Sequence, residues 1–550
     1  MRFFSLLKSK TEKYDLNNII VLFMLAIYPL IVIPGPLDYF RGPRYLILII
    51  IFLLSIYGLV NKNINFKKPY FYFLGLFFLF ALISTFLAQD VTVAWIGSPK
   101  WYTGVSTYIF CVTLFVLALH VHRPFNYFIP MAATASVVSL IAILQHIGID
   151  IIPHELSREG LASFGTMGHP NWLGVYTVLV LPAAVYHFLE SKHYLWLLSS
   201  CLIYAALLTT MTRGAWIAFF IAFLVISIYF HKKPNTRRYY LILIVAFAVA
   251  TLLMLPVDDW ALLNRVSTVQ DQIESSVQLE DRGGSRRIFI WKGALGAIQD
   301  NFYFGLGADN FSEAEVLKHP GMPFHKTHNI YLELFVTMGA FAFLSYTAFL
   351  LYIFIFNLKN SFLYFIVIFT YLVNGLFNHD IIEVFPLFWI VLGLSLSNRN
   401  YAWPDIYEKS NQKKHGEFED ESNLIYKVTG KRTLIKNVIK ALLLIYIVAV
   451  YFWFFFPDEK TVGIPGGGTY TGEMRGAYYH GEGAWESGYG VTYEGEFRYG
   501  KFDGFGIMSY ADGAKYVGEF RENQMHGEGK MIFSDGRVKK GVWKENEFVE

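Results

Sequence analysis

Apolar runs of roughly 17–25 residues, the length that crosses a lipid bilayer, recur along most of this 550-residue chain. The chain is 54% hydrophobic and only 16% charged, which is more apolar and less charged than a soluble enzyme of this length. The pattern predicts an all-α polytopic membrane protein with about 12–13 transmembrane helices. The expected spans are 18–34, 44–60, 70–88, 107–122, 126–147, 172–188, 194–211, 213–231, 239–256, 328–353, 361–377, 380–397 and 436–456.

Basic residues in the connections predict the orientation of these spans. They are concentrated at the N-terminus, in the connection after the eighth span, and between the last two spans. The positive-inside rule therefore places the N-terminus in the cytoplasm, and the long loop 257–327 on the opposite face. Arg41 and Arg44 disagree mildly, because they fall on the outer side. The segment after the thirteenth span is expected outside as well.

The composition changes to Gly, Tyr and Glu from Gly466 onward, and a period of 23 residues appears. Tyr470-Thr471-Gly472-Glu473 recurs at 493–496 and again at 516–519. A fixed period of this size is typical of stacked identical units. The alternation closed by glycines predicts a small all-β domain with one hairpin per unit. The expected domains are 1–397 (membrane domain, with the loop 257–327), 398–435 (cytoplasmic linker), 436–456 (last transmembrane helix) and 466–550 (repeats).

The loop 257–327 and the residues just after it form the longest polar break in the membrane domain. The spacing of Ile288, Trp291, Leu295 and Ile298 predicts an interfacial helix with these side chains on one side. Gly305 and Gly307 predict a turn, and His328 precedes the next apolar helix. Thr327 is the expected N-cap of that helix.

Four side chains on the predicted outer face are candidates for chemistry: Arg213, Arg286, Arg287 and His328. Each also has a plain structural interpretation, namely a helix-end arginine, lipid-headgroup contacts or a structural histidine. Together they fit better with binding of a pyrophosphate by guanidinium groups and with proton transfer by an imidazole. No convincing metal-ligand spacing accompanies them, so we expect neither a metal nor a cofactor.

Residues 89–397 resemble the O-antigen ligase and polymerase superfamily of bacterial membrane glycosyltransferases. The resemblance is carried, in order, by Ala94–Pro99 with Gly104, by Phe164–Asn171, by Arg287 and Trp291 with Gly305-Leu306-Gly307 and Asn310-Phe311, and by His328-Asn329 with Gly339. It implies a glycan donor on undecaprenyl pyrophosphate, a catalytic role for His328, and pyrophosphate binding by Arg213 and Arg287, with Arg286 as a neighbour. His169 departs from the family pattern and receives no role. The tail is similar to MORN repeats, with about three units over 468–545.

The resemblance implies an enzyme that works at the outer face of a bacterial cytoplasmic membrane, and leaves its acceptor open. A ligase, a polymerase of lipid-linked units and a protein oligosaccharyltransferase share the donor and differ in the glycan, lipid or protein acceptor. A transporter of the lipid-linked glycan, or an idle anchor for the tail, are the alternatives from other classes. The net charge of +3 gives no reason to expect nucleic acid. The tail is expected either to bind membrane lipid, envelope polymer or protein, or to act as a spacer.

Overall fold

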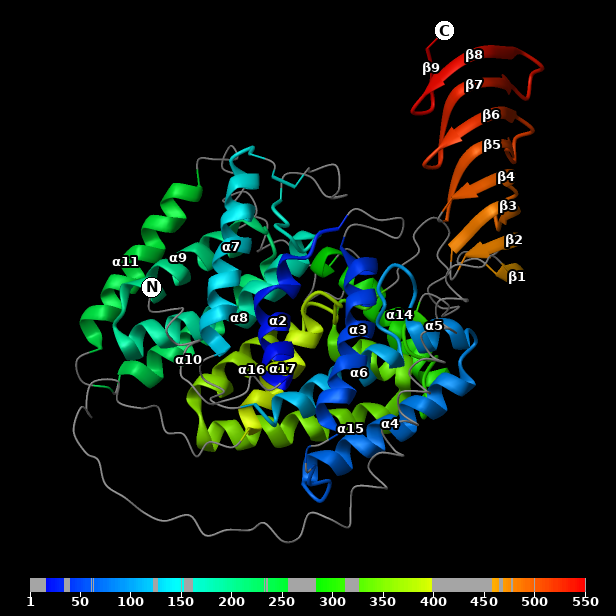
Figure 1. Ribbon diagram of the computed structural model, residues 1–550. Coiled ribbons are helices and arrows are strands. Elements are labelled where there is room, and N and C mark those ends of the chain that lie inside the picture. The colour runs from blue at the N-terminus through cyan, green and yellow to red at the C-terminus, as the bar shows by residue number, and fades with distance from the viewer. Residues whose placement is uncertain are drawn as a thin grey trace. The chain divides into compact units, whose positions relative to one another are not determined.

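The computed structural model describes residues 16–33, 40–60, 62, 64–121, 127–149, 151–152, 162–231, 233, 236–255, 283–311, 326–397, 458–463, 468–475, 478–498 and 500–549. The chain divides into two compact units, with the helices in one and the strands in the other (Figure 1). We describe each unit by itself. The predicted linker 398–435 and the predicted last span 436–456 lie outside the described residues.

The helical unit confirms the predicted class. Each of the twelve predicted spans that fall on described residues corresponds to a helix, and seven of these helices are long and apolar enough to cross a membrane. The seven long helices are α3 (Arg41–Leu59), α4 (Pro69–Leu87), α7 (Phe128–His146), α8 (Pro170–Ser191), α10 (Arg213–His231), α11 (Arg237–Met254) and α15 (Ile330–Asn360). Shorter apolar helices are α2 (Leu16–Ala26) with η2 (Tyr28–Leu30), α6 (Val105–Ala118), α9 (Tyr194–Thr209), α16 (Phe362–Asn374) and α17 (Phe385–Leu396). Two further helices, α5 (Val91–Ile96) and α14 (Gly283–Asp300), lie in connections.

Helix α8 is the most enclosed of the long helices. Nearly all of its residues are buried, and it packs against α9, α10 and α16, whereas α11 is mostly exposed. A helix that is apolar on all sides belongs in the interior of a bundle. Helix α15 packs along α4, and α17 packs along α6 (Figure 1). The bundle therefore has a protein-covered centre and an apolar periphery suited to lipid.

Arg44, which disagreed with the predicted orientation, is fully buried. Its guanidinium donates to the backbone oxygens of Thr166 at 2.9 Å, Pro29 at 3.1 Å and Phe40 at 3.2 Å. A buried charge is tolerated when hydrogen bonds replace its hydration. Arg44 thus ties the start of α3 to η2 and to the loop before α8, and this structural role accounts for a basic residue on the predicted outer side.

The second unit is one antiparallel sheet of nine strands in chain order (Figure 1). The strands are β1 (Asp458–Gly463), β2 (Gly468–Arg475), β3 (Tyr478–Ser487), β4 (Thr492–Arg498), β5 (Lys501–Ser509), β6 (Lys515–Arg521), β7 (Gln524–Ile532), β8 (Val538–Lys544) and β9 (Glu547–Phe548). Each 23-residue period forms one hairpin, β2–β3, β4–β5 and β6–β7, as the repeat predicts. Gly490, Gly513 and Gly536 have φ of +76°, +89° and +84°, which is the turn conformation that glycine adopts at no steric cost. The sheet begins before residue 468, earlier than the repeat pattern indicates.

Tyrosine rings and glycines alternate in the interior of this sheet. Tyr470, Tyr493 and Tyr516 are fully buried at equivalent positions, one in each hairpin. Each ring lies over a glycine of the neighbouring strand, where an added Cβ would overlap it: Gly483, Gly506 and Gly529. The glycines of the motif therefore make room for the tyrosines, and this explains why the period repeats both residue types.

Candidate functional site

His328 lies at the entry to α15 in a left-handed backbone conformation. Its φ is +53°, and Asn329 rather than the expected Thr327 is the N-cap. The Asn329 side-chain oxygen accepts hydrogen bonds from the amides of Tyr331 and Leu332, both at 3.0 Å. The Thr327 hydroxyl instead donates to the Asn329 carbonyl at 2.9 Å. The cap is two residues later than predicted, and His328 lies in the turn between the two positions.

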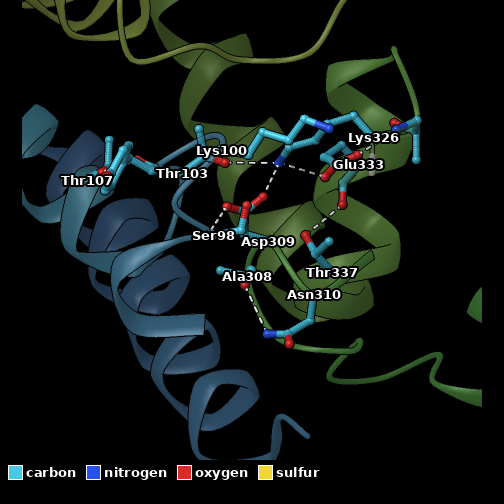
Figure 2. Close-up of polar contacts among 12 residues, drawn as sticks. Ser98, Lys100, Thr103, Thr107, Ala308, Asp309, Asn310, Lys326, Glu333 and Thr337 are labelled. Carbon is cyan, nitrogen blue, oxygen red and sulfur yellow. Dashed lines mark hydrogen bonds and ion pairs between the residues drawn. The ribbon is translucent and has the colours of Figure 1, made fainter. Parts of the chain in front are cut away.

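A buried ammonium group holds the chain just before His328 (Figure 2). The Lys326 Nζ lies 2.5 Å from Asp309 Oδ1 and 3.0 Å from Glu333 Oε1, and it donates to the Thr103 hydroxyl at 2.9 Å. Burial opposes the charge of Lys326, but the two carboxylates outweigh it and raise the pKa of this lysine. We call Lys326, Asp309, Glu333 and Thr103 the lysine knot. One side chain thereby joins the α5–α6 connection, the Gly305–Phe311 turn and the first turn of α15.

The predicted glycine turn is inserted into a break in α15. Gly339 interrupts that helix with φ +78°, and Gly305 and Gly307 have φ of +69° and +94°. The amides of Leu306 and Gly307 donate to the carbonyls of Val336 and Thr337, at 3.1 and 2.7 Å. An added Cβ on Gly305 or Gly339 would overlap the opposite backbone. Amides of the turn thus donate to helix carbonyls that are free at the break in α15. The turn also places Asp309 near the first turn of α15, where Lys326 joins it to Glu333.

The predicted helix is present as α14, but its buried side differs in part from the prediction. Ile288 and Ile298 are buried, while Leu295 is 56% exposed, because Phe311 and Val336 cover the side formed by Ile290, Ala294, Ala297 and Ile298. The Trp291 indole donates to the Thr327 carbonyl at 3.0 Å. The tryptophan that follows Arg287 by four residues therefore fastens α14 to the backbone next to His328.

Arg287 and Arg213 lie close enough to influence each other. Burial, and then the charge of Arg213, lower the pKa of the Arg287 guanidinium to about 10. Arg213 starts α10, whose next residue, Gly214, packs directly against Phe377, so that a Cβ there would meet the phenylalanine side chain at 2.5 Å. Arg286 is part of α14, but its side chain lies outside the described positions. The charges of two of the three predicted arginines therefore influence each other.

The connection between α16 and α17 brings these segments together. Its Gly375 and Leu376 carbonyls accept hydrogen bonds from the Ile330 amide at 2.8 Å and the Asn329 side chain at 3.2 Å. His379, in the same connection, is 5% exposed, and its ring centroid lies 5.1 Å from that of His328 and 4.8 Å from that of Trp101. The segments that carry His328 and Arg213 thus both contact one short connection.

The sequence interpretation missed His379, its neighbour Asp380 and the lysine knot. Asn378-His379-Asp380 is a polar triplet between two apolar runs, and this was the available signal. Burial raises the pKa of Asp380 to about 7, against the hydrogen bond from Tyr371, 2.9 Å long, and the charge of Lys326. Asp380 and the lysine knot line a common cavity of about 20 Å³. This cavity has room for about one water molecule.

His169, which received no role from the sequence, is the N-cap of α8. Its Nδ1 accepts a hydrogen bond from the Asn171 amide at 3.1 Å, and its ring stacks on Trp172. The Arg41 guanidinium lies over the rings of both Trp172 and Trp101. Within the described part of the chain, no group of three or more His, Cys, Asp or Glu side chains is arranged to hold a metal ion.

Models of two known families match parts of the chain. The model of the O-antigen ligase family matches residues 197–347, and the MORN repeat model matches residues 493–515 and 516–536. No curated protein matches the chain. The first match runs from α9 through Arg213, α14 and His328 into α15, so it covers most of the site described above.

These matches confirm the predicted resemblance. The chain is a multi-pass membrane protein in which one segment is similar to the O-antigen ligase family and the tail is similar to MORN repeats. The ligase match supports a membrane glycosyltransferase of the ligase and polymerase superfamily. The first predicted repeat unit, which begins at Tyr470, is not part of the MORN match, although it forms the equivalent hairpin β2–β3.

Proposed function

We propose that the protein transfers a glycan from a polyprenyl pyrophosphate to an acceptor hydroxyl outside the cytoplasmic membrane, without a metal ion. The observation that carries the proposal is the pair Arg213 and Arg287. The charge of one guanidinium lowers the pKa of the other, so the pair is more favourable when an anion lies between them. A pyrophosphate supplies such an anion, and guanidinium groups bind its oxygens in bidentate fashion.

The proposed reaction is a single displacement at the anomeric carbon. The acceptor oxygen forms a bond to that carbon while the bond to the phosphate oxygen breaks, and its electron pair stays on the pyrophosphate. Arg213 and Arg287 stabilise the negative charge that develops on this leaving group, with Arg286 as a neighbour on the same helix. His328 acts as the base for the acceptor proton or as the group that orients the acceptor.

The test uses the purified full-length protein, a polyprenyl-pyrophosphate oligosaccharide, candidate acceptors and EDTA. We expect transfer or chain growth by the wild type, and its loss in His328→Ala. Arg287→Lys should impair transfer although it keeps the charge, because an ammonium cannot bind phosphate through two parallel bonds. Arg237→Lys, the same change at an exposed arginine that starts α11, is the matched control and should retain full activity.

Three results would contradict the proposal or parts of it. Full activity of Arg287→Lys at limiting donor would reject its pyrophosphate role, and unchanged turnover in His328→Ala would remove His328 from the mechanism. Movement of the lipid across vesicles without any transfer would favour a transporter. The identity of the product distinguishes a ligase, a polymerase and a protein oligosaccharyltransferase, which share this donor chemistry.

A further inference from the structure

His379 is a buried imidazole with unused hydrogen-bonding capacity. It is 5% exposed, and neither ring nitrogen has a hydrogen-bond partner among the described residues. Burying such a polar group without a partner costs free energy, so an imidazole is retained there only if something satisfies it. The ring has a fixed place, because it lies edge to face against Trp101 on one side and close to His328 on the other.

Trp101, next to His379, supplies a second buried polar group without a hydrogen-bond partner among the described residues. Its indole Nε1 is buried and, within the described part of the chain, has no hydrogen-bond acceptor. The centroids of the Trp101 and His379 rings are 4.8 Å apart. An indole N–H is a donor only, and a neutral imidazole has one nitrogen that accepts. A hydroxyl group matches both, because its oxygen accepts from the indole while its hydrogen is donated to the imidazole.

The charges around His379 keep this imidazole neutral. The pKa of His379 is lowered well below its ordinary value. Burial is the largest cause, and the charges of four neighbouring residues add to it: His328, Lys326, His169 and Arg287. Lys326 and His328 precede α15, His169 starts α8, Arg287 lies on α14, and Asp380 is the next residue in the chain. An imidazole that stays unprotonated at neutral pH has one ring nitrogen that can accept a hydrogen bond from a hydroxyl group.

We propose that Trp101 and His379 receive the acceptor hydroxyl of the transfer reaction and that His379 takes its proton. This rests on the function proposed above and specifies its acceptor side. The hydroxyl proton passes to an imidazole nitrogen of His379, and the oxygen bonds to the anomeric carbon. The electron pair of the broken bond remains on the pyrophosphate beside Arg213 and Arg287. His328, whose ring centroid lies 5.1 Å from that of His379, orients the reactants.

The experiment compares wild type with His379→Gln, His328→Gln and Trp101→Phe in the full-length protein. The donor is lipid-linked glycan extracted from the native host, and the acceptor is the envelope fraction of the same cells. Binding of undecaprenyl pyrophosphate without glycan is measured in parallel. His379→Gln should lower kcat about 100-fold or more and leave binding of undecaprenyl pyrophosphate within about threefold of wild type. Trp101→Phe should raise KM for the acceptor.

The pH profile separates a proton acceptor from a packing residue. Wild-type kcat should fall only below pH 6.5, the ordinary pKa of histidine, because the pKa of His379 is lowered. This acid limb should vanish in His379→Gln. The residual activity of His328→Gln should keep this acid limb and shift it to higher pH, since one of the charges that lower the His379 pKa is removed. His379→Gly should regain activity when imidazole is added, which a packing residue does not allow.

His187→Gln is the matched control, because His187 is another buried histidine, at the far end of α8 from His169. It should keep wild-type kcat and the acid limb. If wild type transfers glycan and His379→Gln matches it in kcat and pH profile, a bridging water explains the site and the inference is wrong. A loss in His187→Gln equal to that in His379→Gln also overturns it. A wild type that transfers nothing overturns the proposed function itself, together with this inference.

Discussion

The interior beside His328 and the interior of the repeat sheet both bury polar groups, but they satisfy them in different ways. The lysine knot joins Lys326 to partners that come from three separate segments of the chain. In the sheet, the hydroxyls of Tyr470, Tyr493 and Tyr516 donate to the carbonyls of residues three positions later, at 2.7, 2.9 and 3.2 Å. The polar groups beside His328 find their partners only when distant segments of the chain fold together, whereas each buried tyrosine finds its partner within its own repeat.

This difference predicts how each interior responds to substitution. Loss of one buried ion exposes its partners to an apolar surrounding without compensation. Loss of one tyrosine hydroxyl removes a single neutral hydrogen bond, and the ring still fills its space. We therefore expect substitutions near His328 to lower the stability of the helical unit strongly, and substitutions in the sheet to cause small, local losses of stability.

The largest effect is expected for Lys326→Met. It leaves the carboxylates of Asp309 and Glu333 buried without their counter-ion, at a cost of about 3–5 kcal/mol. Thermal unfolding of the full-length protein in detergent should shift strongly downward. Lys540→Met, at an exposed position of β8, should change stability by less than about 0.5 kcal/mol. The triple variant Lys326→Met, Asp309→Asn, Glu333→Gln should recover much of the loss, and a triple variant as unstable as the single one would contradict the ion-pair explanation.

The next effect depends on pH and on Asp380. Because burial raises the folded-state pKa of Asp380 from 3.8 to about 7, its stability contribution is present below pH 4 and is lost as pH rises through 7. The loss is on the order of 2–4 kcal/mol above pH 7. Asp380→Asn can still accept the hydrogen bond from Tyr371, so it should raise the melting temperature at pH 8 and leave it nearly unchanged at pH 4. Equal shifts at both pH values would show that the buried charge is not the cause.

The two regions also differ in what their sequence reveals. Hydropathy is a local property, and the twelve predicted spans on described residues are all helices. The 23-residue period likewise predicts each hairpin and its turn glycines. The order of Arg287, Trp291, Gly305, Gly307 and His328 predicts the site segments through family resemblance, and the structure brings those segments together.

Long-range partners could not be predicted from the same patterns. Lys326 and Thr103 are 223 residues apart, and no periodicity relates them. His379 lies in a short break between two apolar runs, and apart from its polar triplet nothing in the sequence distinguishes this break from an ordinary connection. Only the fold shows that His379 lies beside His328. Helical spacing predicts α14 but not that Phe311 and Val336 cover its other side, so Leu295 is exposed.

A smaller effect is expected for Gly506→Ala in the sheet. The added Cβ would overlap the Tyr493 ring. Overpacking of this kind in a tightly packed core lowers stability by about 1–3 kcal/mol. Hydrogen exchange of the β4 and β5 amides, measured in the full-length protein, should accelerate locally. Gly513→Asn is the control, because its turn is open and Asn tolerates a positive φ. Equal acceleration in both variants would mean that contact with the Tyr493 ring is not what limits exchange in β4 and β5.

The smallest effect tests whether the repeats are independent and equivalent. Tyr470→Phe, Tyr493→Phe and Tyr516→Phe each remove one hydrogen bond to a backbone carbonyl, which is worth about 1 kcal/mol. Each variant should accelerate hydrogen exchange only in its own hairpin and its immediate neighbours, since stacked repeats contact mainly the units beside them. Tyr489→Phe, at a position that is 53% exposed, should have no effect. Acceleration along the whole sheet from one substitution would show that the tail unfolds as a single cooperative unit, and the contrast with the interior beside His328 would then lie in magnitude and not in range.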